Sequence, residues 1–149
     1  DGNTSLRVHK SPGQHSIDIK TQERGNLKMV FLDYILTKDE YSNVGFIKID
    51  VEGYEHKVLK GMSAIVKNSP NIVIQLEYAP QHLADYNFVF EEFADLIKRM
   101  NLKVEYWDLK DSLKKHIHDI FWLNDPTVVN DFKEGIKYSR NLILTRQDG

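Results

Sequence analysis

The fold of the chain is decided by residues 46–62, which read FIKIDVEGYEHKVLKGM. They open with an apolar run, 46–49, that only Lys48 interrupts, as is typical of a mostly buried strand. Gly53 then permits a sharp turn, and beyond it apolar side chains recur at helical spacing. These side chains are Tyr54, Val58, Leu59, Met62, Ile65 and Val66. The stretch therefore predicts a strand, an acidic turn and a helix, which Gly61 either ends or interrupts.

Three carboxylates are expected at one edge of the predicted sheet. Asp50 and Glu52 follow the strand at a spacing of two, so in extended geometry both leave on one face. Glu77 ends the next predicted strand, 72–76, and a helix joins the two strands. This arrangement makes the strands adjacent and parallel, and brings Asp50 and Glu77 to the same edge. Ligands of open α/β sheets bind at that edge, so these three acids are the candidate site residues.

A structural interpretation of the same acids stands beside the functional one. An Asp-x-Glu pair at a strand-to-helix turn often serves only to cap the helix, and Glu77 can simply bind backbone amides. Alternatively, the three carboxylates can hold Mg²⁺ or Ca²⁺, which prefer oxygen ligands, or accept a proton from a substrate hydroxyl.

Several motifs together resemble the signature of the FkbM-type methyltransferases. The central motif is IKIDVEG at 47–53, followed by Glu55 and by LKG at 59–61. Three flanking segments agree with it: 30–33, 72–77 and 141–144. The resemblance implies a Rossmann-like class I α/β fold and an S-adenosylmethionine (SAM)-dependent O-methyltransferase. Its acceptor would be a hydroxyl of a sugar, a polyketide or another small metabolite. On this resemblance Asp50 lies at the donor or acceptor edge and contacts the cofactor, while Glu52 and Glu77 are candidates for orientation, base or metal roles.

The chain departs from that family at the cofactor site. Family members build the site mainly from an upstream strand, its glycine-rich turn and an acid that ends a second strand. This chain has eight glycines, none of them spaced as Gly-x-Gly. It also begins with Asp1 rather than methionine. We therefore expect residues 1–149 to be a single domain, the C-terminal portion of a methyltransferase domain with N-terminal strands missing, and the main SAM site to lie outside this chain.

Two other functions remain open at this stage. One is a non-catalytic α/β interaction module that has lost the cofactor half of the fold. The other is a carboxylate- or metal-dependent hydrolase or transferase that uses Asp50 and Glu52. Without the missing strands, the strand at 46–49 would lack a neighbour, which predicts self-association or a partner segment along that edge.

Composition limits the partners. The chain carries 20 basic and 22 acidic residues and a net charge of −2, so neither nucleic acid nor an anionic membrane is an expected partner. No apolar run approaches the roughly 20 residues that span a bilayer. There are no cysteines, which excludes disulfides and thiolate metal sites and fits a reducing compartment, so we expect a cytoplasmic protein.

The remaining segments carry weaker patterns. Residues 1–16 and 38–45 read as irregular connections, and Asp33 suits the N-cap of a brief helix through Leu36. His56 is expected on a helix surface, while 114–118, with His116 and His118, reads as a solvated loop rather than a metal site. Tyr78, Tyr106 and Trp107 either line a pocket or pack in the core. The other expected elements are strands at 17–19, 29–32, 104–107 and 142–144, a helix over 90–100 that ends at Asn101, a short apolar run at 120–123 and a tail from Arg146.

Overall fold

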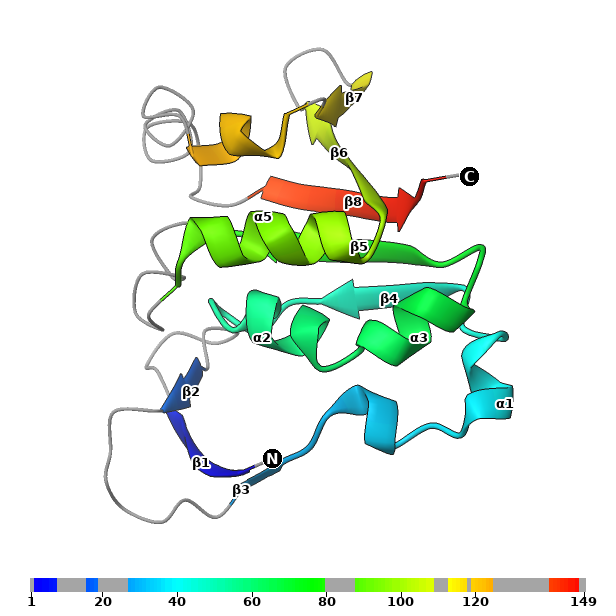
Figure 1. Ribbon diagram of the computed structural model, residues 1–149. Helices are drawn as coiled ribbons and strands as arrows, with labels where there is room; N and C mark the ends of the chain where they lie inside the picture. Colours follow the sequence, from blue (N-terminus) through cyan, green and yellow to red (C-terminus); the bar gives the residue numbers. More distant parts are fainter. Residues whose placement is uncertain are drawn as a thin grey trace.

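The computed structural model describes residues 2–7, 16–18, 27–79, 88–108, 113–117, 119–124 and 140–147. Within them, a five-stranded sheet has the order β4-β5-β8-β6-β7, and a smaller three-stranded sheet has the order β2-β1-β3 (Figure 1). The strands are β1 (Gly2–Arg7), β2 (Ser16–Asp18), β3 (Leu27–Met29), β4 (Phe46–Ile49), β5 (Val73–Tyr78), β6 (Leu102–Asp108), β7 (Leu113–Ile117) and β8 (Arg140–Arg146). The α-helices are α1 (Lys38–Tyr41), α2 (Glu55–Lys60), α3 (Ser63–Asn68) and α5 (Phe90–Arg99), and the 3-10 helices are η1 (Leu32–Tyr34) and η3 (Ile120–Asn124).

The larger sheet is mixed. β4 and β5 are parallel neighbours, with Ile49 opposite Leu76, which confirms the predicted strand-helix-strand unit. β8 is antiparallel to both β5 and β6, so β6 runs in the same direction as β5. β7 then pairs antiparallel with β6 at the far side. The carboxyl ends of β4 and β5 therefore meet at one edge of the sheet.

The two faces of this sheet differ. Along β5, Ile74, Leu76 and Tyr78 are buried, while the residues between them are only partly buried. Helices α2, α3 and α5 lie over the buried face (Figure 1). Among the described strands β4 lies at one edge of this sheet, and its Phe46 side chain is 59% exposed. The expectation that 46–49 is mostly buried was therefore wrong. The side chains of β4 alternate between the two faces, so Ile49 is buried on the helix-covered face while Phe46 and Lys48 are exposed on the other.

The helical pattern after Gly53 forms two short helices rather than one. α2 ends at Lys60 and α3 begins at Ser63, with Gly61 and Met62 between them. Met62 is fully buried, as are Leu59 and Ile65, so both helices contribute to one continuous core. The helical spacing of apolar residues continues from α2 into α3 because the apolar side chains of both helices pack on the same face of the sheet.

Asp33 does not cap a helix of its own. It lies inside η1, and its carboxylate accepts hydrogen bonds from the backbone N–H groups of Ala64 (2.9 Å) and Ile65 (3.0 Å) in the first turn of α3. Asp33 does cap a helix, as predicted, but that helix is α3, which begins thirty residues further along the chain, and not the brief helix expected through Leu36. The strand expected at 29–32 was also misplaced, since β3 ends at Met29.

Three segments expected to be irregular form regular structure. β1 pairs with β2 and β3, for example through Leu6 opposite Ile17. α1 carries a capping box between Thr37 and Glu40, a signal that was visible in the sequence. β7, expected as a solvated loop, pairs with β6 and places His116 opposite Glu105. His118 and the side chains of His116 and Trp107 lie outside what the structure describes.

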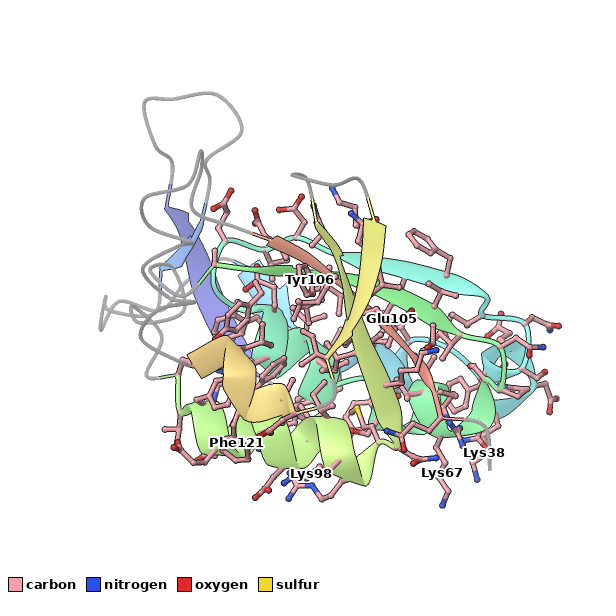
Figure 2. The ribbon with its side chains drawn as sticks, turned by 90° about the horizontal axis from the view of Figure 1, so that it is seen from above. Lys38, Lys67, Lys98, Glu105, Tyr106 and Phe121 are labelled. Carbon is pink, nitrogen blue, oxygen red and sulfur yellow. The ribbon has the colours of Figure 1, made fainter. Side chains whose placement is uncertain are left out.

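In the described part of the C-terminal half, α5, β6 and β8 follow the sequence pattern. α5 ends at Arg99, and Asn101 follows with φ 54°, a left-handed conformation that asparagine tolerates. The strands expected at 104–107 and 142–144 lie within β6 and β8, and that expected at 17–19 overlaps β2. Arg146, expected in a tail, ends β8. The apolar run at 120–123 forms η3, which packs on α5: Lys98 Nζ lies 5.2 Å from the ring centroid of Phe121 (Figure 2).

Tyr78 and Tyr106 belong to the core. Both are buried, and the Tyr78 ring stacks on Phe93 with 6.1 Å between centroids. Burial raises the pKa of Tyr78, so its phenol stays protonated at neutral pH. Packing, rather than lining a pocket, is therefore the role of these two aromatics. None of the helices in the described ranges is long and apolar enough to cross a membrane.

Candidate active site at the carboxyl edge of the sheet

Three acids converge where β4 and β5 end. Asp50, Glu52 and Glu77 each offer a carboxylate oxygen, and these oxygens all lie within 4.8 Å of one another. Asp50 is exposed, while Glu52 and Glu77 are half-buried. The predicted common edge for Asp50 and Glu77 is therefore confirmed, and it follows from the parallel pairing of their strands. We call Asp50, Glu52 and Glu77 the carboxylate cluster.

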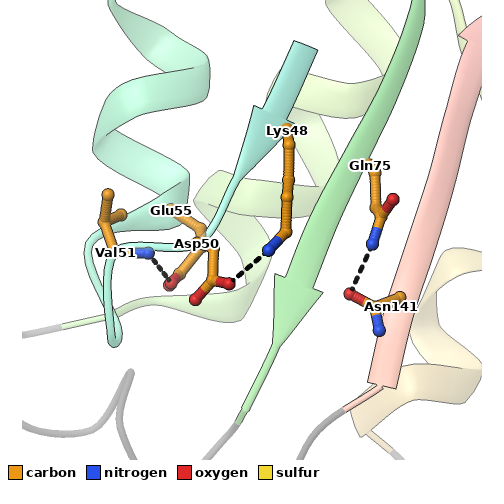
Figure 3. Close-up of polar contacts among 6 residues, drawn as sticks. All are labelled: Lys48, Asp50, Val51, Glu55, Gln75 and Asn141. Atoms are coloured by element: carbon orange, nitrogen blue, oxygen red, sulfur yellow. Dashed lines mark hydrogen bonds and ion pairs between the residues drawn. The ribbon is translucent and has the colours of Figure 1, made fainter. Parts of the chain in front are cut away.

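Lys48 supplies the positive charge beside the carboxylate cluster. Its Nζ lies 2.7 Å from Oδ2 of Asp50 (Figure 3). The hydrogen bond to Asp50 and then the negative charge of Asp50 raise the pKa of Lys48; burial opposes the rise, and the charge of Glu77 adds to it. Lys48 therefore remains a cation at neutral pH and cannot act as a base. Its side chain is 54% exposed, so the ion pair is screened by solvent and serves to orient Asp50 rather than to stabilise the fold.

Glu52 joins the cluster through an unusual backbone conformation. Its φ is 54° and that of Gly53 is 103°, so two consecutive residues are left-handed. Such a conformation costs a residue with a side chain about 1–2 kcal/mol and persists where the surroundings enforce it, often at functional sites. Asp50 and Glu52 do come together as expected, but not because an extended strand continues through them. The strand ends at Ile49, and the left-handed turn brings Glu52 back to the cluster.

Glu55 was not among the predicted site residues, although it belongs to the central motif. It is 2% exposed, and its Oε1 accepts hydrogen bonds from the N–H groups of Val51 (3.0 Å) and Gly53 (3.1 Å); Figure 3 shows the first of these. Burial raises the pKa of Glu55, the backbone hydrogen bonds oppose that rise, and the charge of Glu77 adds to it. In the sequence, only its place in the central motif indicated that Glu55 could belong to the site.

His56 does not lie on the helix surface as expected. Both ring nitrogens are buried without a hydrogen-bond partner among the described residues, and the ring meets Phe88 edge-on at 5.1 Å between centroids. Burial, followed by the charges of Lys57 and Lys60, lowers the pKa of His56 to about 4. The imidazole is therefore neutral at pH 7, and it is not one of the converging groups of the cluster.

The polar surface continues from the cluster across the neighbouring strands. Glu77 is paired in register with Asn141 of β8. The Asn141 Oδ1 accepts a hydrogen bond of 3.1 Å from Nε2 of Gln75, on the same side of the sheet as Lys48 and Asp50 (Figure 3). These amides extend a hydrogen-bonding surface suited to hydroxyl-bearing molecules.

The arrangement has two chemical capabilities. Three closely spaced carboxylates attract cationic groups and can accept protons or hydrogen bonds from hydroxyls. Their oxygens are also the ligand type of Mg²⁺ and Ca²⁺, and Asp50, Glu52 and Glu77 would hold such an ion. Lys48 would then compete with the ion for Asp50, because both are cations at one carboxylate.

Comparison with known protein families gives one match. The family model described as the methyltransferase FkbM domain matches residues 3–107, more than half of the chain. This range contains the carboxylate cluster, Lys48 and Glu55. Comparisons with curated proteins and with solved structures found no significant match.

Proposed function

The chain belongs to the FkbM methyltransferase family, and from that premise we propose that it forms the acceptor-side edge of a SAM-dependent O-methyltransferase. The acceptor is a hydroxyl group on a sugar, a polyketide or a related small metabolite. The observation that carries the proposal is the convergence of Asp50, Glu52 and Glu77 at the carboxyl ends of β4 and β5, inside the range that the family model matches.

The chemistry of the cluster fits part of SAM. The cofactor supplies a methyl group on a positively charged sulfonium, and its methionine end carries an ammonium group. Three carboxylates offset by one lysine leave a negative edge that favours such a cation. Asp50 is the residue we assign to contact with the cofactor. The nucleoside end requires a close backbone approach of the kind that a glycine-rich turn permits, and we propose that this contact lies outside the 149 residues.

The acceptor requires orientation and a route for its proton. A carboxylate within hydrogen-bond reach of the hydroxyl accepts that proton as the oxygen becomes a nucleophile, an effect worth about 100- to 10,000-fold in rate. Glu77 and Glu52 are half-buried and stand beside Asp50, so they are the candidates for this role. Lys48 keeps Asp50 oriented through its 2.7 Å contact. Alignment of the hydroxyl against the methyl carbon supplies a further part of the rate.

The fold also supports a Rossmann-like assignment. In the sheet, β4, β5 and β6 share a direction, and β8 lies antiparallel between β5 and β6. We propose that this is the C-terminal part of the open sheet of a class I methyltransferase, with ligands at the carboxyl edge.

The test is Asp50→Asn in the full-length protein, assayed for S-adenosylhomocysteine release with a panel of sugar, polyol and polyketide acceptors. The substitution removes the charge and keeps the size, so we expect intact folding and a loss of about 2 kcal/mol or more of transition-state stabilisation. Asp39→Asn on α1, which is exposed, is the matched control. Equal kinetics for Asp50→Asn and the wild type would remove Asp50 from the site, and no transfer by the wild type to any acceptor would refute the proposed reaction.

A further inference from the structure

The left-handed turn between β4 and α2 must be held by surrounding contacts, because Glu52 does not favour this backbone conformation by itself. Glu52 adopts φ 54°, a conformation that L side chains disfavour. The peptide N–H groups on either side of it belong to Val51 and Gly53. Binding both N–H groups holds the peptide planes before Val51 and before Gly53, and so restrains the path of the turn and the direction in which Glu52 leaves the backbone.

Glu55 binds both of these groups with one oxygen. It is the first residue of α2, and instead of pointing to solvent its side chain returns to the turn that precedes the helix. Its Oε1 lies 3.0 Å from the Val51 nitrogen and 3.1 Å from the Gly53 nitrogen. A carboxylate is also favoured at a helix N-terminus, so the position is compatible with its charge.

The placement of Glu55 is costly. The side chain is 2% exposed, and its Oε2 is buried with no hydrogen-bond partner among the described residues. A buried charge without a cationic partner destabilises a fold, whereas glutamine would offer a similar acceptor without the charge. A smaller apolar side chain would leave two peptide N–H groups without their acceptor. The benefit that offsets the cost is the geometry of the turn.

We propose that Glu55 is a positioning residue that holds the left-handed turn at Glu52 and Gly53, and thereby keeps the Glu52 carboxylate beside those of Asp50 and Glu77. Glu55 acts through the backbone of the turn and touches neither cofactor nor acceptor. The proposal rests on the proposed function for its kinetic consequence, while its structural consequence is measurable without any substrate.

The experiment compares Glu55→Gln, Glu55→Asp and Glu55→Ala in the full-length protein, with Glu91→Ala on α5 as the matched control. Glu91 is also a glutamate in the first turn of a helix, but it is exposed. The first measurement is amide hydrogen exchange at Val51 and Gly53, with Ile74 and Leu76 of β5 as internal references. The second is kcat and KM for methyl transfer.

Glutamine keeps an acceptor oxygen, so Glu55→Gln should retain exchange rates and kcat within about threefold of the wild type. Glu55→Ala removes the acceptor, and Glu55→Asp is one methylene too short to reach both N–H groups. In these two variants we expect exchange at Val51 and Gly53 to accelerate at least about tenfold while β5 is unchanged. Their kcat should fall at least about tenfold with a smaller change in KM, because misplaced groups lose rate steeply.

The outcomes separate this proposal from the proposed function. Unchanged exchange at Val51 and Gly53 in Glu55→Asp would overturn the positioning role, even if Glu55→Ala failed to fold. Losses in Glu55→Gln as large as those in Glu55→Asp would overturn it too, because they would make the charge, not the acceptor, decisive. If the wild type transfers no methyl group, the proposed function fails, and the exchange measurement still decides whether Glu55 holds the turn.

Discussion

Asp33 and Arg146 bind opposite ends of the same helix, α3. The Asp33 carboxylate accepts from the first-turn N–H groups of Ala64 and Ile65, at 2.9 and 3.0 Å. The Arg146 Nη1 donates to the carbonyl oxygens of Val66 (3.0 Å) and Lys67 (2.9 Å). An acid at the N-terminus and a base at the C-terminus also complement the helix dipole. A six-residue helix is too short to be stable by itself, so these two side chains help to hold it.

Asp33→Ala should destabilise the protein through the loss of this cap. We expect the free energy of unfolding to fall by about 1–2 kcal/mol, because two N–H groups of α3 lose their acceptor and are only partly accessible to water. Urea denaturation measures the change. Asp39→Ala, in the first turn of α1, is exposed and should change stability much less. Equal stability of Asp33→Ala and the wild type would show that the cap contributes nothing.

Gly61→Ala should conflict with Phe31. A Cβ at Gly61 would lie 2.8 Å from Cδ1 of Phe31, closer than real contacts allow, whereas the φ of −78° suits alanine. We expect a loss of about 1–2 kcal/mol from overpacking. In a Phe31→Ala background the same change should be neutral or stabilise by up to about 1 kcal/mol. The double-mutant cycle measures this coupling, and additive effects would contradict the predicted contact.

His56 should make stability depend on pH between about 4 and 6.5. The pKa of His56 is lowered to about 4 in the folded state, below its ordinary value of 6.5. In that window the unfolded chain binds the proton more tightly, so stability falls as the pH falls, by about 1–3 kcal/mol in total. The raised pKa of Glu55 acts in the opposite sense, because protonation on acidification relieves its burial cost.

The variant that isolates this effect is His56→Phe, which keeps an aromatic ring against Phe88 and removes the titration. The unfolding free energy of the wild type minus that of the variant should fall as the pH falls from 7 to 4. Only the wild type carries the histidine whose protonation favours the unfolded chain. Thermal or urea unfolding across that range provides the curves. Parallel curves would mean that the histidine ring is not shielded in solution.

The 149-residue chain alone should bind SAM only weakly. No pair of its eight glycines has the Gly-x-Gly spacing that lets a backbone approach the nucleoside. Contact at Asp50 cannot offset several kcal/mol of lost freedom on its own. Calorimetric titration with SAM should therefore show no saturation at micromolar concentrations. Stoichiometric micromolar binding to a monomer would place the cofactor site within these residues.

Some features of the site could be read from local sequence. The change from a strand pattern to a helical pattern around Gly53 fixed the strand-turn-helix order, and the apolar run 72–76 fixed the next strand. Two strands joined by a helix are parallel neighbours for general topological reasons, so Asp50 and Glu77 had to share an edge. These predictions succeeded because each depends on contacts between segments close in sequence, whose periodicity survives in the fold.

Other features were decided only by tertiary structure. The partner of Asp33 lies on another helix, and β1 pairs with β3 from a later segment. β7 exists through pairing with β6, and the ring nitrogens of His56 are buried where Phe88 packs on the ring. Glu52 reaches the cluster through a left-handed turn whose Val51 and Gly53 N–H groups donate to Glu55, and no periodic pattern in the sequence indicates that turn. The physical reason is common to all of them. Hydrogen bonds and burial formed in the folded chain outweigh local preferences of about 1 kcal/mol, and they become defined only when the chain has folded.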